Sequence, residues 1–440
     1  DGRILGTDDY GHKYLNVGTA VANLDVDFGF SDIFAKGQEV SYYETEGAND
    51  NGKVKFVVNE DALSDFDGFM SYNRIKQSLE TVNFNDKLVN AILFDEAVGD
   101  RIAQRMGFAD YDAYDAAAQQ NGDLEHAFYT IAEDDEYTVT NMALLGGAFS
   151  TAVDINNEVW NALDRRMTLA NLNAPRAAYG VTPWVDVIGT TNEAKDLFGG
   201  AGYEADIYGA TLGADYTASC GAILGAAISI GQADANSVDA STKVDNDVDF
   251  WGVSFYGSHR IGNVNGKFDI GYVSTSNDLS SSSAYFGTVK ESLDADIFTV
   301  GVGAEYLATV GSLNVVPHAG IRWSSLDMDD SKYGADYDKM NLFQMPIGVA
   351  FSGTFDMTGW KVAPMLDISV VPTFGDKDAV ASYTGGIKDT VRVVDSNPVQ
   401  MTLGVNATVD AWTLGVNYGL SAGSDERLNN AFNFHARYTF

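Results

Sequence analysis

The sequence predicts an all-β membrane fold: a 12-stranded antiparallel transmembrane β-barrel with an N-terminal α-helix in the lumen, preceded by a helical and partly β region outside the membrane. Three observations lead to this fold class. Apolar and polar residues alternate with a period of two from Tyr179 onward. The alternating segments number twelve, and transmembrane barrels have an even number of strands. The connections between these segments are alternately short and long.

Composition narrows the classes of function. The chain has 440 residues, with 27 Lys and Arg against 62 Asp and Glu, and a formal net charge of −35. This charge leaves no basic surface for phosphates, so we expect no nucleic-acid partner. The 45 Gly, 24 Phe and 22 Tyr exclude a disordered acidic tail, which would be poor in aromatic residues. The single cysteine, Cys220, forbids an intrachain disulfide and argues against a cysteine-ligated metal site.

The chain divides into four regions. Residues 1–80 contain short β-like pieces between acidic and Asn-Gly segments, and their start lacks the pattern of a signal peptide, so we expect a mature chain or a fragment. Residues 81–154 have apolar residues at helical spacing. Residues 155–176 continue as a single helix that ends at Pro175. The barrel occupies residues 177–440.

The twelve predicted strands have one apolar and one small or polar face. Between Trp412 and Leu420, for example, every second residue is apolar and the residues between are Thr, Gly or Asn. Mean hydropathy is only −0.11, because a membrane strand carries its apolar residues at alternate positions. The predicted strands are 179–190, 202–217, 219–233, 247–262, 265–276, 293–308, 312–325, 341–354, 358–373, 397–409, 411–421 and 429–440.

A soluble β-sandwich or propeller would also show alternation. In such folds the outward face is charged and the inward face is large. Here one face carries Trp, Phe, Tyr, Leu and Val, and the other is rich in Gly, Ser, Thr and Asn, which suits the wall of a lumen better than a packed core. Pro317, Pro346 and Pro364 argue against a closed barrel unless bulges accommodate them, because each lacks a ladder donor.

The last predicted strand has aromatic residues at alternate positions. It resembles the terminal strand that the barrel-assembly machinery recognises in outer-membrane proteins of Gram-negative bacteria, and this resemblance implies that machinery as a partner. The residues that carry it are Phe432, Phe434, Tyr438 and Phe440.

The order of a helix, twelve strands and a terminal Phe resembles the translocator domain of the monomeric autotransporters, the type V secretion proteins. The first strand contains Trp184 within YGVTPWV, like the opening strand of that family. The second contains YGATLGADY at 208–216, close to the family pattern G-x-x-L-G-A-D-Y. The resemblance covers roughly residues 83–440, with a linker helix at 155–172.

This resemblance implies a function and a location. The domain would insert in the bacterial outer membrane and mediate secretion or surface display of an N-terminal passenger, of which residues 1–80 would be the end. The implied partners are outer-membrane lipids, lipopolysaccharide and the chain's own passenger, and we expect a monomer. A passive porin or a surface anchor without cargo is the alternative of a different class, and a soluble multi-domain binding protein is the third.

The geometry of residues 155–172 agrees with a helix in the pore. Eighteen residues at ~1.5 Å per residue span about 27 Å, close to the ~25 Å apolar band of such barrels. We expect its two arginines to face lumen carboxylates such as Glu305, although an amphipathic helix packed outside the barrel would show a similar pattern. The candidate pore residues are Asn156, Asn157, Glu158, Trp160, Arg165 and Arg166.

We expect no catalytic residue, cofactor or metal. Some family members cleave their passenger by cyclisation of an asparagine in an Asn-Asn pair, but alignment of the helix places Trp160 and Asn161 at that pair, so self-cleavage is not expected. A barrel phospholipase would need Ser and His together on the lipid side, whereas His318 and His435 are predicted to point inward. Five aspartates between Asp327 and Asp338 fit a solvated loop better than a calcium site.

Overall fold

The protein is described by a computed structural model, whose chain separates into two compact units. The structure describes residues 6–7, 13–16, 40–44, 53–58, 96–118, 124, 127, 131, 135, 138–171, 180–198, 201–240, 242–283, 287–383, 388–424 and 426–439. Most of the predicted upstream regions, the end of the predicted linker helix with Pro175, and Phe440 therefore lie outside the described residues.

The first unit contains short strands and two helices in its described part. Four strands form a small antiparallel sheet in the order β1-β2-β4-β3: β1 (Gly6–Thr7), β2 (Lys13–Asn16), β3 (Val40–Glu44) and β4 (Lys53–Val58). The helices α5 (Glu96–Arg105) and α6 (Tyr111–Ala118) pack through Ala103 and Tyr114, which are both buried. Strand β4, with the sequence KVKFVV, is one of the short β-like pieces predicted within residues 1–80.

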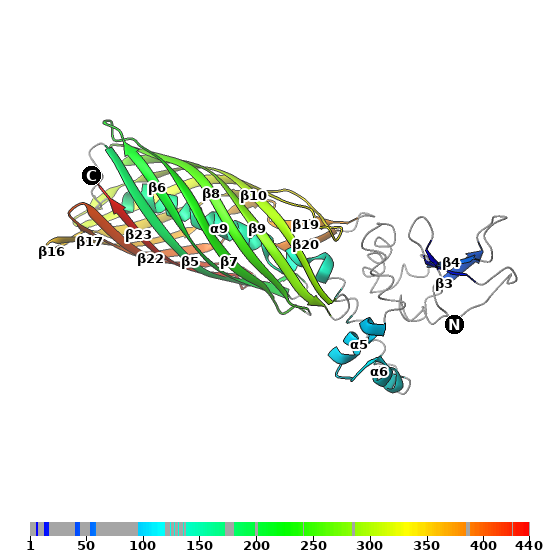
Figure 1. Ribbon diagram of the computed structural model, residues 1–440. Coiled ribbons are helices and arrows are strands. Elements are labelled where there is room, and N and C mark those ends of the chain that lie inside the picture. Colours follow the sequence, from blue (N-terminus) through cyan, green and yellow to red (C-terminus); the bar gives the residue numbers. More distant parts are fainter. Residues whose placement is uncertain are drawn as a thin grey trace. The chain divides into compact units, whose positions relative to one another are not determined.

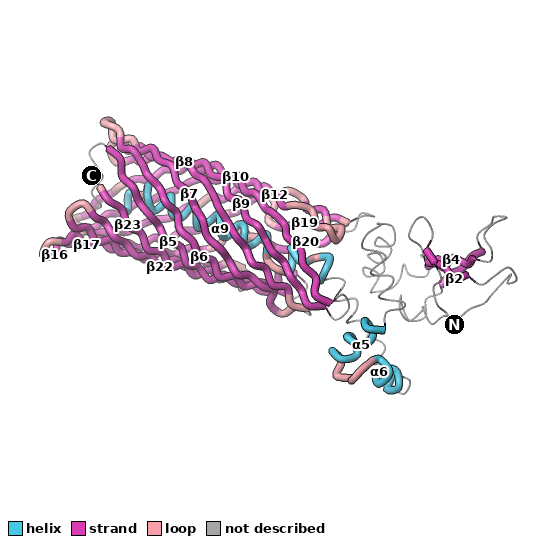
Figure 2. Tube along the Cα trace, in the orientation of Figure 1, coloured by secondary structure: helices cyan, strands magenta, loops and turns pink. Residues whose placement is uncertain are grey.

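The second unit is a closed antiparallel barrel of twelve strands (Figures 1 and 2). Closure is made by β23 and β5, which pair from Leu428–Glu193 to Arg437–Trp184. The fold class predicted from alternation is thus confirmed. The strands are β5 (Gly180–Phe198), β6 (Ala201–Thr217), β7 (Ile223–Val238), β8 (Val244–Ile261), β9 (Val264–Ser283), β10 (Gly287–Tyr306), β12 (Leu313–Met328), β14 (Met340–Gln344) with β15 (Ile347–Gly353), β17 (Trp360–Val370) with β18 (Thr373–Gly375), β21 (Val399–Val409), β22 (Trp412–Ala422) and β23 (Leu428–Tyr438).

Five short strands complete the unit. At the short-turn end, β11 (Ala308–Val310) pairs with β12 and β16 (Phe355–Met357) with β17. At the opposite end, the connections after β12 and β18 contribute a small separate sheet of β13 (Asp336–Tyr337), β19 (Asp378–Ser382) and β20 (Lys388–Arg392).

The strands on one side of the barrel are longer than predicted. Segments 191–201, 234–246 and 277–292 were expected as long loops, but most of their residues extend β5–β10 to 16–20 residues each. By contrast, β21, β22 and β23 have 11 residues each. The loop prediction was wrong because the outward side chains of these segments are polar, whereas the outward side chains of the strands within the membrane are apolar.

In the long strands, the apolar side chains change from the outer face to the inner face at one level along the barrel. Within the membrane part the outward residues are large and apolar, as with Trp251 and Phe255, and the inward residues are polar, as with Ser254. Beyond this level Val248 and Phe250 point inward and are buried, whereas Asp247 and Asp249 are exposed. Adjacent apolar pairs mark the change in four strands: Ile207-Tyr208, Phe250-Trp251, Tyr272-Val273 and Ile297-Phe298.

Aspartates line the outer surface beyond that level. Asp206 of β6 lies directly opposite Asp234 of β7, which faces Asp247 of β8, which in turn faces Asp278 of β9. All four are exposed. Like charges in directly opposed strand positions destabilise a sheet, so part of the net charge of −35 acts against the barrel here.

The prolines that argued against closure do not shift the strand register. Pro346 separates β14 from β15, yet Ala319 pairs with Ile347 and Arg322 with Gln344, which keeps the same register on both sides of the break. The carbonyl of Pro346 accepts a hydrogen bond from Gly320 N at 2.9 Å. No bulge is needed, because the neighbouring ladder bonds hold the interrupted strand in place.

A helix occupies the lumen, as predicted (Figures 1 and 2). It is α9 (Ala148–Met167), preceded by the short α8 (Met142–Leu145) and followed by a 3-10 turn, Leu169–Asn171. The helix begins seven residues before Ile155, the start predicted from sequence, because buried uncharged residues extend it upstream. Among the described residues, no helix is both long and apolar enough to cross a membrane.

Candidate functional site

The direction of α9 in the barrel is fixed by contacts at its two ends. At its start, the carbonyl of Gly146 accepts a hydrogen bond from Asn246 Nδ2 at 3.4 Å, at the end of the barrel that carries the long connections. At its other end, the carbonyl of Met167 accepts a hydrogen bond from Asn265 Nδ2 at 3.2 Å, beside the short β8–β9 turn. The helix therefore runs from the long-loop end to the short-turn end.

Arg165 and Arg166 bind the barrel wall through two separate carboxylates. Arg165 donates to both oxygens of Asp186 on β5 at 2.9 and 3.0 Å, and Arg166 donates to both oxygens of Asp215 on β6 at 2.5 and 2.7 Å. The pairing of a planar guanidinium with two oxygens fixes orientation as well as charge. The helix is thereby held against β5 and β6.

Glu305, the carboxylate expected for the arginines, binds other groups. Its Oε1 accepts from Lys267 Nζ at 2.7 Å, and its Oε2 accepts from the backbone N of Leu169 at 2.7 Å. Lys267 also donates to Asp164 of α9 at 2.5 Å. The expected partner was wrong in identity: Glu305 stands on β10, near the C-terminal end of α9, where it accepts from the backbone N–H of the 3-10 turn that follows the helix.

The wall around Arg166 contains a chain of buried hydrogen bonds. Tyr256 Oη donates to Asp215 at 3.0 Å and accepts from Trp184 Nε1 at 2.6 Å. The rings of Trp184 and Tyr256 also meet edge to face at 6.0 Å and pack against Leu163 of the helix. The aromatic residue that marked the first strand in the sequence therefore orients the carboxylate that binds the plug.

A second network holds the upper part of α9. Asp154 accepts hydrogen bonds from Tyr203 Oη at 2.5 Å and from Asn429 Nδ2 at 3.2 Å. Arg427 donates to Tyr203 Oη at 3.0 Å, and its guanidinium lies 5.5 Å from the tyrosine ring. This network joins the helix to β6, β23 and the β22–β23 connection.

The other predicted pore residues lie around Arg322 of β12. Its guanidinium donates to Asn157 Oδ1 at 3.5 Å and to the carbonyl of Asn156 at 3.4 Å, and stacks 4.8 Å from the Trp160 ring. Glu158 accepts from Asn161 Nδ2 at 3.1 Å. All six candidate residues of the helix thus make contacts in the lumen.

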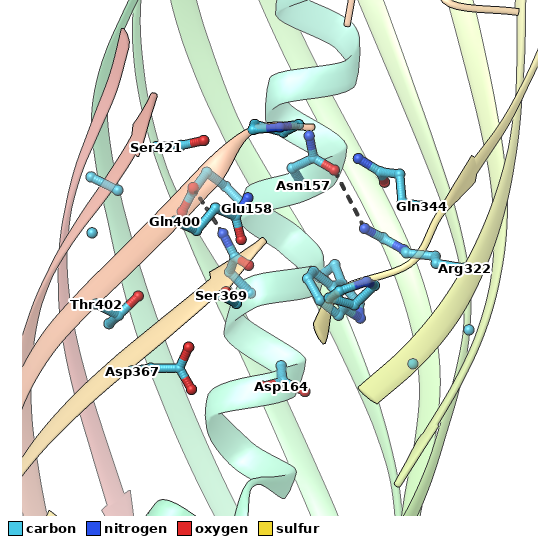
Figure 3. A pocket seen from close by; sticks show the side chains of 18 of the residues that line it. Asn157, Glu158, Asp164, Arg322, Gln344, Asp367, Ser369, Gln400, Thr402 and Ser421 are labelled. Carbon is cyan, nitrogen blue, oxygen red and sulfur yellow. Dashed lines mark hydrogen bonds between the residues drawn. The ribbon is translucent and has the colours of Figure 1, made fainter. Parts of the chain in front are cut away.

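A cavity of about 190 Å³ lies on one side of α9 (Figure 3). Figure 3 shows Asn157, Glu158 and Asp164 of the helix on this side, with Arg322 and Gln344 across from them. Further lining residues come from β17, β21 and β22, including Asp367 and Thr402. The other side of the helix contacts β5–β8. The helix therefore fills the lumen unevenly, against the wall of long strands.

Sequence reasoning missed the wall partners Asp186, Asp215, Lys267 and Arg322. Their signal was present, because each is a charged residue at an inward position of a predicted strand. Inward charges inside a barrel need counter-charges, so these positions point to the helix that supplies them. Alternation by itself separates the two faces of a strand and does not indicate which inward charge meets the helix.

Among the residues the structure describes, no group of three or more His, Cys, Asp or Glu side chains could hold a metal ion. His318 contacts Asp367 at 2.8 Å and His435 contacts Asn406 at 2.6 Å, both inside the lumen as expected from alternation. In the loop after β12, Asp330 accepts a hydrogen bond from the backbone N of Tyr337 at 3.0 Å.

The last strand presents its aromatic residues to the outside. Phe432 and Phe434 are 63% and 44% exposed. Tyr438 packs edge to face on Trp412 of β22 with ring centroids 5.0 Å apart. Because β23 closes the barrel against β5, these residues belong to the continuous outer surface.

Comparisons with known proteins identify the barrel. The family model described as the autotransporter beta-domain matches residues 183–419, more than half of the chain. A sequence search of curated proteins returned no match. Similar solved structures include the beta domain of the Bordetella autotransporter BrkA (14% identity, 59% of this chain and 99% of that one, TM-score 0.46), the translocator domain of NalP from Neisseria meningitidis (13%, 68% and 99%, 0.49) and the transport unit of AIDA-I from Escherichia coli (15%, 64% and 98%, 0.49).

The translocator fold is non-enzymatic, and its context is the outer membrane together with the protein's own passenger. The chain belongs to the autotransporter family, and its barrel is a translocator domain of the Gram-negative outer membrane that secretes an N-terminal passenger or displays it on the cell surface.

Proposed function

We propose that the barrel carries the upstream chain outward and that α9 then remains in the lumen as a plug. The direction of α9 is the observation that carries this proposal. Short turns of outer-membrane barrels lie in the periplasm, so the start of α9 lies at the outer end and Met167 at the inner end. A chain that enters α9 from outside and leaves it inside to begin β5 is the product of passage through the barrel.

The plug interpretation rests on the ion pairs of the helix. Arg165, Arg166 and Asp164 all have partners on the wall. A helix caught in transit would not match several wall charges at once, because buried charges are tolerated only when paired. We therefore assign α9, whose charged part at residues 154–167 pairs with the wall, as the resting plug and residues 1–80 as the end of the passenger.

Further partners follow from the surface of the barrel. The exposed apolar side chains of the membrane part fit outer-membrane lipids and lipopolysaccharide, and the aromatic pattern of the last strand fits recognition by the barrel-assembly machinery. A closed barrel offers no free strand edge, which supports a monomer. We assign no catalytic activity to the chain, and the pore plug keeps its Asn156-Asn157 bond intact.

Conductance in planar bilayers tests the plug. We expect the full chain to conduct poorly and a variant lacking residues 148–167 to conduct freely. Heat-modifiable migration in detergent gels checks that both barrels are folded. If the full chain conducts as well as the deletion variant, the barrel is an open porin and the plug assignment fails.

Surface exposure tests transport. Protease added to intact cells should cut the region upstream of residue 138 while the barrel remains intact. Failure of cleavage in intact cells, with cleavage after permeabilisation, would place the upstream region in the periplasm and contradict the proposal.

A further inference from the structure

The interior of the barrel becomes more apolar beyond the membrane part. In the membrane part, many inward residues are polar or charged, such as Thr211 and Asp215. Beyond it, most inward positions of the long strands are buried apolar side chains, with polar residues such as Asn246, Asn277 and Glu291 between them. The apolar residues include Ile207, Ala233, Val248, Leu279, Leu293 and Leu326. We call this apolar space the vestibule.

The segment that fills the vestibule matches it in character. Residues 137–153 carry no charged side chain, whereas residues 154–167 carry five. Every residue from 142 to 153 is buried. A Cβ added at Gly146 would lie 2.9 Å from Leu279 and Val244, and one added at Gly147 would lie 2.7 Å from Tyr203, so the chain approaches the wall closely here.

The small outer sheet covers part of the same segment. The ring of Phe149 meets that of Tyr337 on β13 at 5.3 Å. Ala379 and Ala381 on β19 are completely buried. The uncharged segment is therefore enclosed both by the long strands and by the two long connections that form the sheet.

We propose that the vestibule is the site that ends transport: it receives residues 142–153 and holds them at the outer mouth, which stops the chain and seals the pore. This proposal rests on outward transport through the barrel. An empty vestibule exposes apolar surface to water, and burial of an uncharged segment removes that cost, whereas burial of charged passenger residues would add one. The ion pairs of residues 154–167 then set the register of the helix below it.

Near-isosteric polar substitutions in the vestibule test this proposal. The wall variant combines Val248→Thr, Leu279→Asn and Leu293→Asn. The reporter is Ala148→Cys in a Cys220→Ser background, labelled with a membrane-impermeant maleimide on intact cells. Ala148 is fully buried in the parent structure. Because the new polar groups must lose their water when the uncharged segment packs on them, we expect labelling of the reporter to rise at least about tenfold.

A matched variant separates the vestibule from the ion pairs. Asp215→Asn is also near-isosteric but lies in the polar part of the lumen, and we expect it to leave the reporter at residue 148 protected. Heat-modifiable migration establishes that each barrel is closed. If the wall variant does not fold, Leu144→Gln with Leu145→Gln changes only the segment and decides the question by the same labelling.

The outcomes distinguish this inference from outward transport itself. Labelling in the wall or segment variant, with protection in the parent, supports the vestibule as the stop site. Protection to within twofold in every folded variant overturns it, while proteolysis of the upstream region on intact cells would still support transport. Equal labelling in the Asp215→Asn control also overturns it, because the ion pairs would then hold the segment.

Discussion

Replacing Asp215 with Asn measures how strongly the lower half of the plug is held. The Arg166 and Asp215 side chains are 5% and 0% exposed, so the variant leaves a buried guanidinium without its counter-ion. Removal of one partner of a buried ion pair costs about 3–5 kcal/mol. At the lower value, the equilibrium between docked and undocked states of the lower end of α9, around Leu163 and Arg166, shifts by roughly 150-fold.

The assay is labelling of a cysteine at position 163 in the folded barrel, with Cys220 replaced by Ser. Leu163 is 2% exposed and packs against Trp184 and Tyr256, so a thiol there reacts only when the helix undocks. Asp327→Asn is the control, because the Lys339–Asp327 pair is more than half exposed and should contribute about 0–1 kcal/mol. Equal labelling rates in the Asp215 and Asp327 variants would refute the reasoning.

Three further predictions concern the wall and the start of the plug. Val416→Arg places a charge on the lipid side and should destabilise the folded barrel by roughly 2–4 kcal/mol, which lowers the temperature at which it loses its folded gel mobility. An unchanged temperature would contradict the assignment of this face to lipid. Asp247→Asn should raise that temperature, since it removes one charge and with it two repulsive cross-strand pairings of about 0.2–1 kcal/mol each. Gly147→Ala should make α8 sensitive to protease, because Gly147 has φ +67° and an added Cβ would collide with Tyr203. Full resistance to protease would contradict this prediction and would show that Tyr203 can move aside.

The barrel was predictable where lipid imposes a regular pattern. An outward residue such as Val416 must be apolar and its inward neighbours polar, so alternation indicated twelve strands, and their even number and alternating connection lengths predicted the closed barrel. Beyond the membrane this constraint ends. Val248 and Asp247 still alternate, but with the apolar residue inward, and a search for outward apolar residues assigned that stretch to a loop.

The site was predictable in kind but not in its pairings. A helix with Arg165 and Arg166 requires carboxylates in the lumen, and the structure supplies Asp186 and Asp215 on the first two strands. Which inward carboxylate meets which arginine depends on the rotation and depth of the helix. These are set by packing of Leu163 and by residues upstream of Ile155, which sequence periodicity did not include in the helix.

The adjacent apolar pairs at the membrane border restrict how this barrel can change in length. At Phe250-Trp251 the apolar residues pass from the inner to the outer face while the in–out alternation continues, so deletion of one residue above that point would turn every side chain of the upper strand to the wrong face. Removal of two residues would preserve the facing. Homologous barrels with the same border should therefore differ in the height of their outer walls by even numbers of residues per strand.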